Sequence, residues 1–238
     1  MATQDRFKDL EWFNTVSSQT VGVVGAGGIG SWLTMLLARA GCNDIFIFDF
    51  DTLEEHNIGG QMYPVSTIGQ TKVKALASII KDFSGLNLST YVEKYVPSSI
   101  TNEIMFSAVD NMAARKVIFE RWVELFEATQ NKNMLFIDGR MLAENLQIYV
   151  VTPDRIEEYK ATLFEDSEVE EQPCTAKATS HCGALIGSLM VSAYTNWANN
   201  LTQDIRIVPF SITVNLAFFE FETDLLRKAT QSLESPVE

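Results

Sequence analysis

Residues 21–31 of the chain read Val-Gly-Val-Val-Gly-Ala-Gly-Gly-Ile-Gly-Ser. An apolar strand leads directly into a glycine turn, and an apolar helix follows over residues 31–40. Three of the glycines, Gly25, Gly27 and Gly30, have the spacing G-x-G-x-x-G. Residues without Cβ let the backbone turn tightly, approach a phosphate closely and pack a helix against a strand. The stretch therefore predicts a strand–turn–helix unit of an α/β sheet.

The residues around this turn make it a candidate nucleotide site. The N-terminus of the following helix offers free N–H groups to an anion. A second apolar strand, Ile45 to Phe48, ends in Asp49, which lies roughly 20 residues beyond the glycines, where an acidic side chain usually accepts hydrogen bonds from a ribose. We therefore expect an adenine nucleotide here. The glycines expected to contact it are Gly25, Gly27, Gly28 and Gly30.

Composition disfavours several other classes of protein. The chain has 238 residues, 46% of them hydrophobic, which suits one domain with a substantial core. The net charge is −13 and no run is rich in lysine or arginine, so nucleic-acid binding is not expected. The apolar stretch 182–197 is too short and too polar to span a membrane. An odd number of cysteines without a dense framework fits the cytoplasm.

The order of apolar segments predicts a Rossmann-like α/β fold: a mostly parallel sheet with helices on both faces, extended by antiparallel strands at the C-terminal side. Parallel strands are expected at 20–25, 45–49, 89–93, 104–108 and 134–138. Helices are expected at 29–40, 69–82 and 112–130, and the added antiparallel strands at 145–152 and 206–221.

We expect the whole chain, 1–238, to be a single domain with two special segments. Residues 1–19 are expected to form an N-terminal helical arm. Residues 153–180 are polar and acidic and are expected to form a long, mobile crossover loop over a bound partner. A buried helix over 183–199 follows, and it is a candidate subunit interface.

Several ordered motifs narrow the chemistry. Asp49-Phe50-Asp51 is followed by Asn-Ile-Gly-Gly-Gln at 57–61, by Ile-Gly-Gln-Thr-Lys at 68–72, and by Asp110-Asn111 with Arg115 nearby. This order resembles the ThiF/MoeB family, the adenylating enzymes related to ubiquitin-activating enzymes. The resemblance covers residues 20–140, and a weaker match continues through Pro173-Cys174 and the helix that begins at Gly183.

The resemblance implies ATP-dependent adenylation of a carboxylate. An acid attacks the α-phosphorus of ATP and pyrophosphate leaves, so the protein must hold the triphosphate, spread its charge and align the acid. In this interpretation Lys72 reaches the phosphates and Asp110 holds Mg²⁺, which prefers carboxylate and phosphate oxygens. The other residues expected at the site are Asp49, Asp51, Asn57 and Gln61.

Each of these side chains also has a structural interpretation, which the sequence leaves open. A short polar side chain often caps a turn or a helix, and a lysine or arginine often lies on a solvated helix face. The alternatives are a turn at Asp49, a turn at Asn57, an N-cap at Asp110, a solvated face carrying Lys72 with Lys74 and Lys81, and a helix surface at Arg115.

One motif departs from the family. The N-l-x-R-Q block of the family carries an arginine where this chain has Gly60. The loss matters because lysine cannot copy the bidentate fork of a guanidinium. Three explanations stay open: Arg6, Arg39 or Lys74 substitutes for it; a partner subunit of a dimer supplies an arginine; or the site binds a nucleotide without turning it over.

The cysteines raise a separate question. Many relatives carry two C-x-x-C pairs for zinc, but Cys174 and Cys182 stand apart here, so structural zinc is not expected. Some relatives form a thioester, which makes Cys182, at the start of a helix, and Cys174, in the acidic loop, candidate nucleophiles. Cys42 comes just before a strand and is expected in the core.

The resemblance therefore implies an ATP- and Mg²⁺-dependent adenylyltransferase that acts as a homodimer. Its expected substrate is the C-terminus of a ubiquitin-like or sulfur-carrier protein, or a peptide. One alternative is a non-catalytic ThiF-like subunit that pairs with an active relative, which Gly60 favours. A second is an NAD-dependent oxidoreductase, which the glycine turn and Asp49 allow but Lys72 and Asp110 disfavour, because a dehydrogenase has no use for Mg²⁺.

Overall fold

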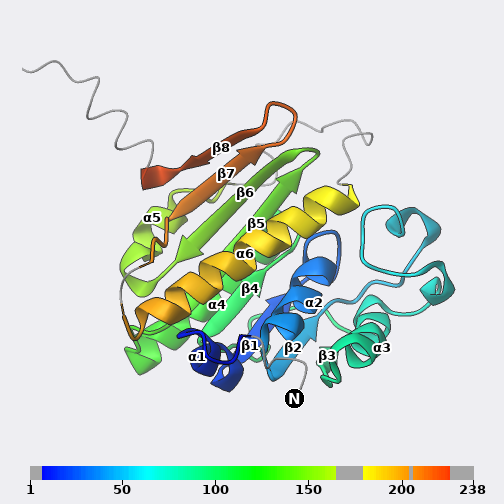
Figure 1. Ribbon diagram of the computed structural model, residues 1–238, viewed down its shortest axis with the longest axis horizontal. Helices are drawn as coiled ribbons and strands as arrows, with labels where there is room; N and C mark the ends of the chain where they lie inside the picture. The colour runs from blue at the N-terminus through cyan, green and yellow to red at the C-terminus, as the bar shows by residue number, and fades with distance from the viewer. Residues whose placement is uncertain (1–6, 165–178, 204–205, 226–238) are drawn as a thin grey trace, which may run out of the picture.

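The described strands form one eight-stranded sheet of order β3-β2-β1-β4-β5-β6-β7-β8 (Figure 1). The computed structural model describes residues 7–164, 179–203 and 206–225. The parallel strands are β1 (Thr20–Val24), β2 (Asp44–Phe48), β3 (Ser89–Tyr91), β4 (Ile104–Ser107) and β5 (Leu135–Leu142). The antiparallel strands are β6 (Asn145–Val151), β7 (Ser211–Asn215) and β8 (Glu220–Thr223). This arrangement confirms the predicted fold class.

Helices cover both faces of the sheet (Figure 1). One face carries α1 (Phe13–Ser18), α2 (Gly30–Ala40), α3 (Lys72–Ser84) and α6 (Ser180–Asn200). The other face carries α4 (Met112–Thr129) and α5 (Ile156–Lys160). No helix of the described ranges has the length and apolar character that crossing a membrane requires.

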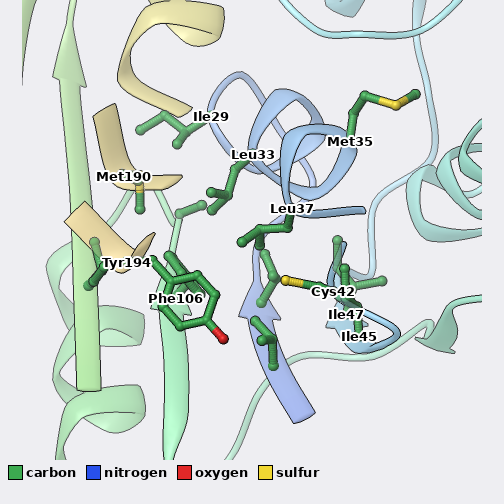
Figure 2. Close-up of a cluster of buried hydrophobic side chains, with 14 of the residues drawn as sticks. Ile29, Leu33, Met35, Leu37, Cys42, Ile45, Ile47, Phe106, Met190 and Tyr194 are labelled. Carbon is green, nitrogen blue, oxygen red and sulfur yellow. The ribbon is translucent and has the colours of Figure 1, made fainter. Parts of the chain in front are cut away.

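The sheet separates two apolar layers because successive strand residues point to opposite faces. In β2, Ile45 and Ile47 belong to the layer under α2, α3 and α6, whereas Phe46 and Phe48 belong to the layer under α4 and α5. Figure 2 shows how side chains from α2, β2, β4 and α6 meet in the first layer, with Cys42 among them. The prediction that Cys42 lies in the core is confirmed.

α6 crosses the sheet beside α2, and glycines allow a close approach between the two helices (Figure 1). A Cβ at Gly183 would lie 2.3 Å from the carbonyl oxygen of Gly28, and one at Gly187 would lie 3.1 Å from the amide nitrogen of Leu33. The start of α6 therefore packs directly on the glycine turn. The expected buried helix is present, and it begins at Ser180 rather than at residue 183.

Other expected elements also have different bounds in the structure. The helix expected over 69–82 begins at Lys72, because Gly69 has a φ of +87° and the preceding residues form a turn. The strand expected over 206–221 is a hairpin of β7 and β8, which a turn with Phe219 at a φ of 54° separates. A left-handed residue breaks a regular element in both places.

The crossover segment is partly helical where it is described. Residues 153–155 form the 3₁₀ helix η4 and α5 follows at once, so the beginning of the expected loop is ordered by short helices. Residues 165–178, which include most of its acidic run, lie outside the described residues. Of the expected N-terminal arm, α1 is present, and residues 1–6 also lie outside the described ranges.

Candidate nucleotide-binding site

The candidate site lies where the strand order reverses. β1 pairs with β2 on one side and with β4 on the other, so the segments that leave β1 and β4 diverge at the same edge of the sheet. Ligands of open α/β sheets bind in the crevice at such a switch point, outside the carboxyl ends of the strands. The glycine turn, residues 49–51 and residues 108–111 follow β1, β2 and β4 at this edge.

The three spaced glycines have different steric roles. Gly25 has a φ of +97°, and a Cβ there would lie 2.5 Å from the carbonyl oxygen of Ala108 in the segment after β4. A Cβ at Gly30 would lie 1.8 Å from the carbonyl oxygen of Gly25. Around Gly27, by contrast, no atom lies within 4 Å of the position a Cβ would take. Gly25 and Gly30 therefore hold the turn together, whereas Gly27 leaves open space.

The same turn offers unpaired donors toward that space. Ser31 donates its N–H to the carbonyl oxygen of Gly27, but the amides of Gly27 and Gly28 donate to no acceptor within the described residues. The turn therefore combines free N–H groups, a helix N-terminus and open space. This combination suits a phosphate group.

Asp49 ties the second strand to the glycine turn. Its Oδ2 accepts the N–H of Ala26 at 2.7 Å, and its Oδ1 accepts the N–H of Asp51 at 2.8 Å. Burial raises the pKa of this carboxyl, and the Ala26 amide and the nearby Lys72 charge oppose the rise. The turn contact that the sequence left open is therefore present. Each oxygen keeps a further lone pair for a ligand hydroxyl.

Lys72 lies against Asp51 at the start of α3. The Lys72 Nζ is 2.6 Å from Asp51 Oδ2, and the Lys72 N–H donates to the carbonyl oxygen of Asp51. Only 8% of the Lys72 side chain is exposed, whereas Lys74 is exposed. The alternative that placed Lys72 on a solvated helix face is therefore wrong. Its ammonium group is held beside the crevice, next to Asp49.

Asn57 and Gln61 lie on the segment that follows. Asn57 ends the 3₁₀ helix η2 (Glu55–Asn57), and its side-chain oxygen accepts the N–H of Glu54 at 2.9 Å in a capping box. The turn role that the sequence allowed for Asn57 is therefore present. Gln61 differs, because its Oε1 is buried and has no hydrogen-bond partner in the described part of the chain. A buried acceptor of this kind needs a donor, which a bound ligand can supply.

Asp110 keeps its carboxylate available. The N-cap of α4 is Asn111, whose Oδ1 accepts the N–H of Ala114 at 2.8 Å, so the N-cap alternative for Asp110 is wrong. Asp110 is exposed, and its one described side-chain contact is with Asn111 Nδ2 at 3.1 Å. An exposed carboxylate without a described cationic partner is a suitable ligand for a divalent cation.

For Arg115 the sequence left open a position on the helix surface, and that alternative is wrong. Arg115 is buried, its Nε donates to Asp138 Oδ1 at 2.7 Å, and its Nη2 donates to the carbonyl oxygen of Val109 at 2.7 Å. Asp138 is fully buried at the end of the parallel part of β5. The sequence showed Arg115 as a basic residue shortly after Asp110, but no local pattern linked it to Asp138.

The candidate substitutes for the missing arginine at Gly60 have different positions. Arg39 donates to the carbonyl oxygen of Phe83 from the last turn of α2, about 14 Å along the axis from the glycine turn. Arg39 is therefore the wrong candidate. Lys74 is exposed on the first turn of α3, and Arg6 lies outside the described residues. Lys74 remains as a described side chain that could serve.

The two described cysteines are both buried. Cys182 has no exposed surface, and its Sγ accepts a hydrogen bond from the Thr179 hydroxyl at 3.2 Å. Burial raises the pKa of the Cys42 thiol to about 12. Neither thiol meets the need of a nucleophile for access to a substrate in this conformation. Cys174, the other candidate nucleophile, lies outside the described residues.

The fold is that of an α/β protein of the Rossmann type. A sequence model of the ThiF family matches residues 5–233, which is nearly the whole chain. The chain therefore belongs to the ThiF family, as its motifs predict.

Individual relatives agree with this membership. Ubiquitin-like modifier-activating enzyme 5 of Caenorhabditis elegans is 28% identical over 123 residues, covering 44% of this chain and 29% of the relative. Adenylyltransferase and sulfurtransferase MOCS3 of Culex quinquefasciatus is 29% identical over 130 residues, covering 52% and 30%. The chain thus spans less than a third of the length of each of these two relatives.

Among solved structures, Escherichia coli MccB with ATP has a similar fold. The two superpose with a TM-score of 0.64 at 13% sequence identity, over 90% of this chain and 66% of MccB. At this identity the likeness concerns the fold.

Proposed function

We propose that this protein is an ATP- and Mg²⁺-dependent adenylyltransferase that activates a carboxylate. The observation that carries the proposal is the set of groups around the switch point. The glycine turn is open at Gly27, the Lys72 ammonium is held beside it, and the Asp110 carboxylate is exposed with no described cationic partner. A triphosphate needs donors and positive charge, and its metal needs a carboxylate.

The proposed reaction forms one bond and breaks another. An oxygen of the acceptor carboxylate bonds to the α-phosphorus of ATP, and the bond from that phosphorus to the bridging oxygen breaks. Pyrophosphate leaves with the electron pair, and the product is an acyl adenylate. The protein needs no nucleophile of its own, because its task is to hold the phosphates and to align the acid.

The chain's own residues divide this task. The free amides of Gly27 and Gly28 and the Lys72 ammonium hold phosphate oxygens, while Asp49 accepts hydrogen bonds from the ribose. The fixed positive charge of Lys72 counters charge that develops on the leaving pyrophosphate. Asp110 is the residue that would hold Mg²⁺. When bound, the ion neutralises phosphate charge as a Lewis acid.

The proposed acceptor is the C-terminus of a ubiquitin-like or sulfur-carrier protein, or a peptide. The names of the two curated relatives, a ubiquitin-like modifier-activating enzyme and an adenylyltransferase, support this class. We further propose a cytoplasmic homodimer of single-domain subunits. In such a dimer a partner subunit can supply the cation that Gly60 does not.

A second candidate function follows from Gly60 itself. The chain could be a non-catalytic subunit that binds a nucleotide and pairs with an active relative. The buried Lys72 and the exposed Asp110 favour the enzyme, because a site that no longer turns over its nucleotide gains nothing from a carboxylate without a described cationic partner. An NAD-dependent oxidoreductase is disfavoured because a dehydrogenase has no use for the Mg²⁺ that Asp110 would hold.

Exchange of radiolabelled pyrophosphate into ATP tests the proposal. The pure protein is assayed with Mg²⁺, with and without candidate carrier proteins or peptides. We expect exchange that is lost in Lys72→Ala and kept in Lys81→Ala, the matched control at the exposed far end of α3. ATP binding without exchange under all conditions would favour the non-catalytic subunit, and tight NAD binding without ATP binding would revive the oxidoreductase.

A further inference from the structure

We propose that Arg115, anchored by Asp138, is a positioning residue that holds Asp110 in place for the metal. This inference rests on the proposed function, in which Asp110 holds Mg²⁺. Arg115 is buried, and its described partners are Asp138 and backbone carbonyl oxygens. It acts through the peptide groups on either side of Asp110.

The guanidinium of Arg115 binds the backbone around Asp110. Its Nη2 donates to the carbonyl oxygen of Val109 at 2.7 Å, and its Nη1 lies 3.5 Å from the carbonyl oxygen of Asn111. The residues immediately before and after Asp110 are therefore held by one side chain. Asn111 is fixed a second time, because its own side chain caps α4. The carboxylate of Asp110 is left exposed on a fixed backbone.

The anchor of this guanidinium is a fully buried carboxylate. Asp138 Oδ1 accepts from Arg115 Nε at 2.7 Å, while Asp138 Oδ2 accepts from Arg140 Nε at 2.8 Å and from the Tyr159 hydroxyl at 2.9 Å. Asp138 therefore has donors from α4, β5 and α5. A carboxylate with three charged or hydroxyl donors cannot swing away, so the position of Arg115 is fixed in turn.

A metal ligand benefits from such support. Mg²⁺ requires near-ideal octahedral geometry and tolerates little misplacement of its carboxylate. A carboxylate on an exposed loop samples many positions unless its backbone is fixed, and ordering it upon binding costs free energy. Groups that orient a ligand are typically worth about 10–100-fold in metal affinity or activity. Arg115 supplies this orientation through hydrogen bonds that a lysine cannot copy, because only a guanidinium presents a planar fork.

The simpler interpretation is a structural ion pair. A buried arginine–aspartate pair stabilises a fold against loss of either partner, whatever the adjacent loop does. The two interpretations differ in what they predict for the metal. A structural pair affects the free energy of unfolding alone, whereas a positioning residue also changes the Mg²⁺ concentration that the folded protein requires.

The test compares Arg115→Lys with Arg121→Lys on the full chain. Arg121 is on the same helix and pairs with Glu124, so the same change there leaves the Asp110 loop untouched. Binding of ATP is measured by calorimetry without metal and at increasing Mg²⁺, and pyrophosphate exchange is measured over the same Mg²⁺ range. Amide hydrogen exchange of residues 109–111 is followed in the protein without nucleotide.

For Arg115→Lys we expect about 10–100-fold more Mg²⁺ to be needed for half-maximal exchange, with metal-free ATP binding unchanged. Amides of residues 109–111 should exchange faster, and Arg121→Lys should match the wild-type protein in every measurement. Tyr159→Phe removes one donor from Asp138 without removing its charge partners, so it should shift the Mg²⁺ requirement in the same direction by a smaller factor.

Two outcomes would overturn different statements. If Arg115→Lys and Tyr159→Phe unfold more easily but keep the wild-type Mg²⁺ requirement and amide exchange, the pair is structural and the positioning role is rejected. If the wild-type protein itself shows neither pyrophosphate exchange nor Mg²⁺-dependent ATP binding, the proposed function fails and the role of Asp110 fails with it. The wild-type result therefore separates the two failures.

Discussion

The loops that follow β2 and β4 both carry aspartates, and they use them in opposite ways. After β2, the carboxylate of Asp49 accepts two backbone N–H groups, and that of Asp51 binds Lys72. After β4, the carboxylate of Asp110 is exposed, and the backbone around it is held by Arg115 instead. The carboxylates of the loop after β2 hold that loop in place. In the loop after β4 the arginine holds the backbone, and the Asp110 carboxylate is left exposed.

This difference separates stability from function at the two loops. Removing a carboxylate after β2 leaves buried donors or a buried ammonium without a partner, which costs stability. Removing the carboxylate after β4 leaves the backbone contacts of Arg115 and Asn111 unchanged. Mutations in the first loop should therefore change folding and activity together, and mutations of Asp110 should change activity alone.

The largest expected effect on activity is that of Asp110→Asn. Pyrophosphate exchange should fall by at least about a hundredfold, because a neutral amide is a poor ligand for Mg²⁺. The free energy of unfolding, measured with urea, should stay within about 0.5 kcal/mol of the wild-type value, since the side chain is exposed. Asp49→Asn is the comparison variant, and it should lower both quantities. Equal destabilisation by the two variants would remove the contrast between the loops.

Lys72→Ala should come next, with exchange reduced by roughly a hundredfold through loss of a fixed positive charge. It should also lower the free energy of unfolding by about 1 kcal/mol, because the Asp51 carboxylate loses its ion pair. The double variant with Asp51→Ala sharpens this result. Stability should then be partly restored while exchange stays low; restored exchange would mean that Lys72 only neutralises Asp51.

Two glycines of the turn should respond differently to alanine. Gly30→Ala forces a Cβ to within 1.8 Å of a carbonyl oxygen, so we expect a loss of about 3 kcal/mol in the free energy of unfolding. Gly27→Ala meets open space, so the protein should keep its stability while its ATP dissociation constant rises about tenfold. Urea unfolding and calorimetry measure the two effects, and an unchanged affinity in Gly27→Ala would place the phosphates elsewhere.

Gly60→Arg tests whether the departure from the family motif limits the enzyme. The φ of Gly60 is not in the left-handed region, so an arginine fits the backbone there. If no other cation substitutes, pyrophosphate exchange should rise about tenfold, since an arginine at transferring phosphates stabilises charge. Gly59→Arg, at an adjacent open position, is the matched control. No gain from Gly60→Arg would indicate that another residue or a partner subunit already supplies the charge.

The smallest effect concerns the buried thiols. At about pH 8 an ordinary thiol with a pKa near 8.5 is partly ionised, whereas burial raises the Cys42 pKa to about 12. The folded state therefore binds the Cys42 proton more tightly than the unfolded state does. The contribution of this proton to the free energy of unfolding is complete below the pKa of the unfolded state, and it is lost as the pH rises through the pKa of the folded state. Mapping of alkylated peptides from the native protein should find neither Cys42 nor Cys182 modified. Rapid labelling of Cys182 would restore it as a candidate nucleophile.

The parallel half of the fold could be predicted because its signals are local. Apolar runs, the glycine spacing and the acids at strand ends all report on adjacent residues, and they placed five strands and the carboxyl edge. The hairpin of β7 and β8 was read as one strand, because the turn depends on a phenylalanine, Phe219, that adopts a positive φ. Nothing in that residue type signals a turn.

The part of the site that the sequence missed depends on contacts between distant segments. Arg115 and Asp138 are 23 residues apart, and only the pairing of β4 with β5 brings their elements together. The sequence pattern also could not show whether Asp110 or Asn111 is the N-cap of α4, because both residue types cap helices well. Local chemistry therefore indicates the candidate residues, whereas tertiary packing determines which contacts each of them makes.

A crystal structure with a non-hydrolysable ATP analogue and Mn²⁺ would locate the metal directly through its anomalous signal. We expect one metal bonded to the Asp110 carboxylate and to phosphate oxygens, with the triphosphate over Gly27 and Gly28 and the ribose beside Asp49. A nucleotide bound at another edge of the sheet, or a metal held without Asp110, would contradict this expectation.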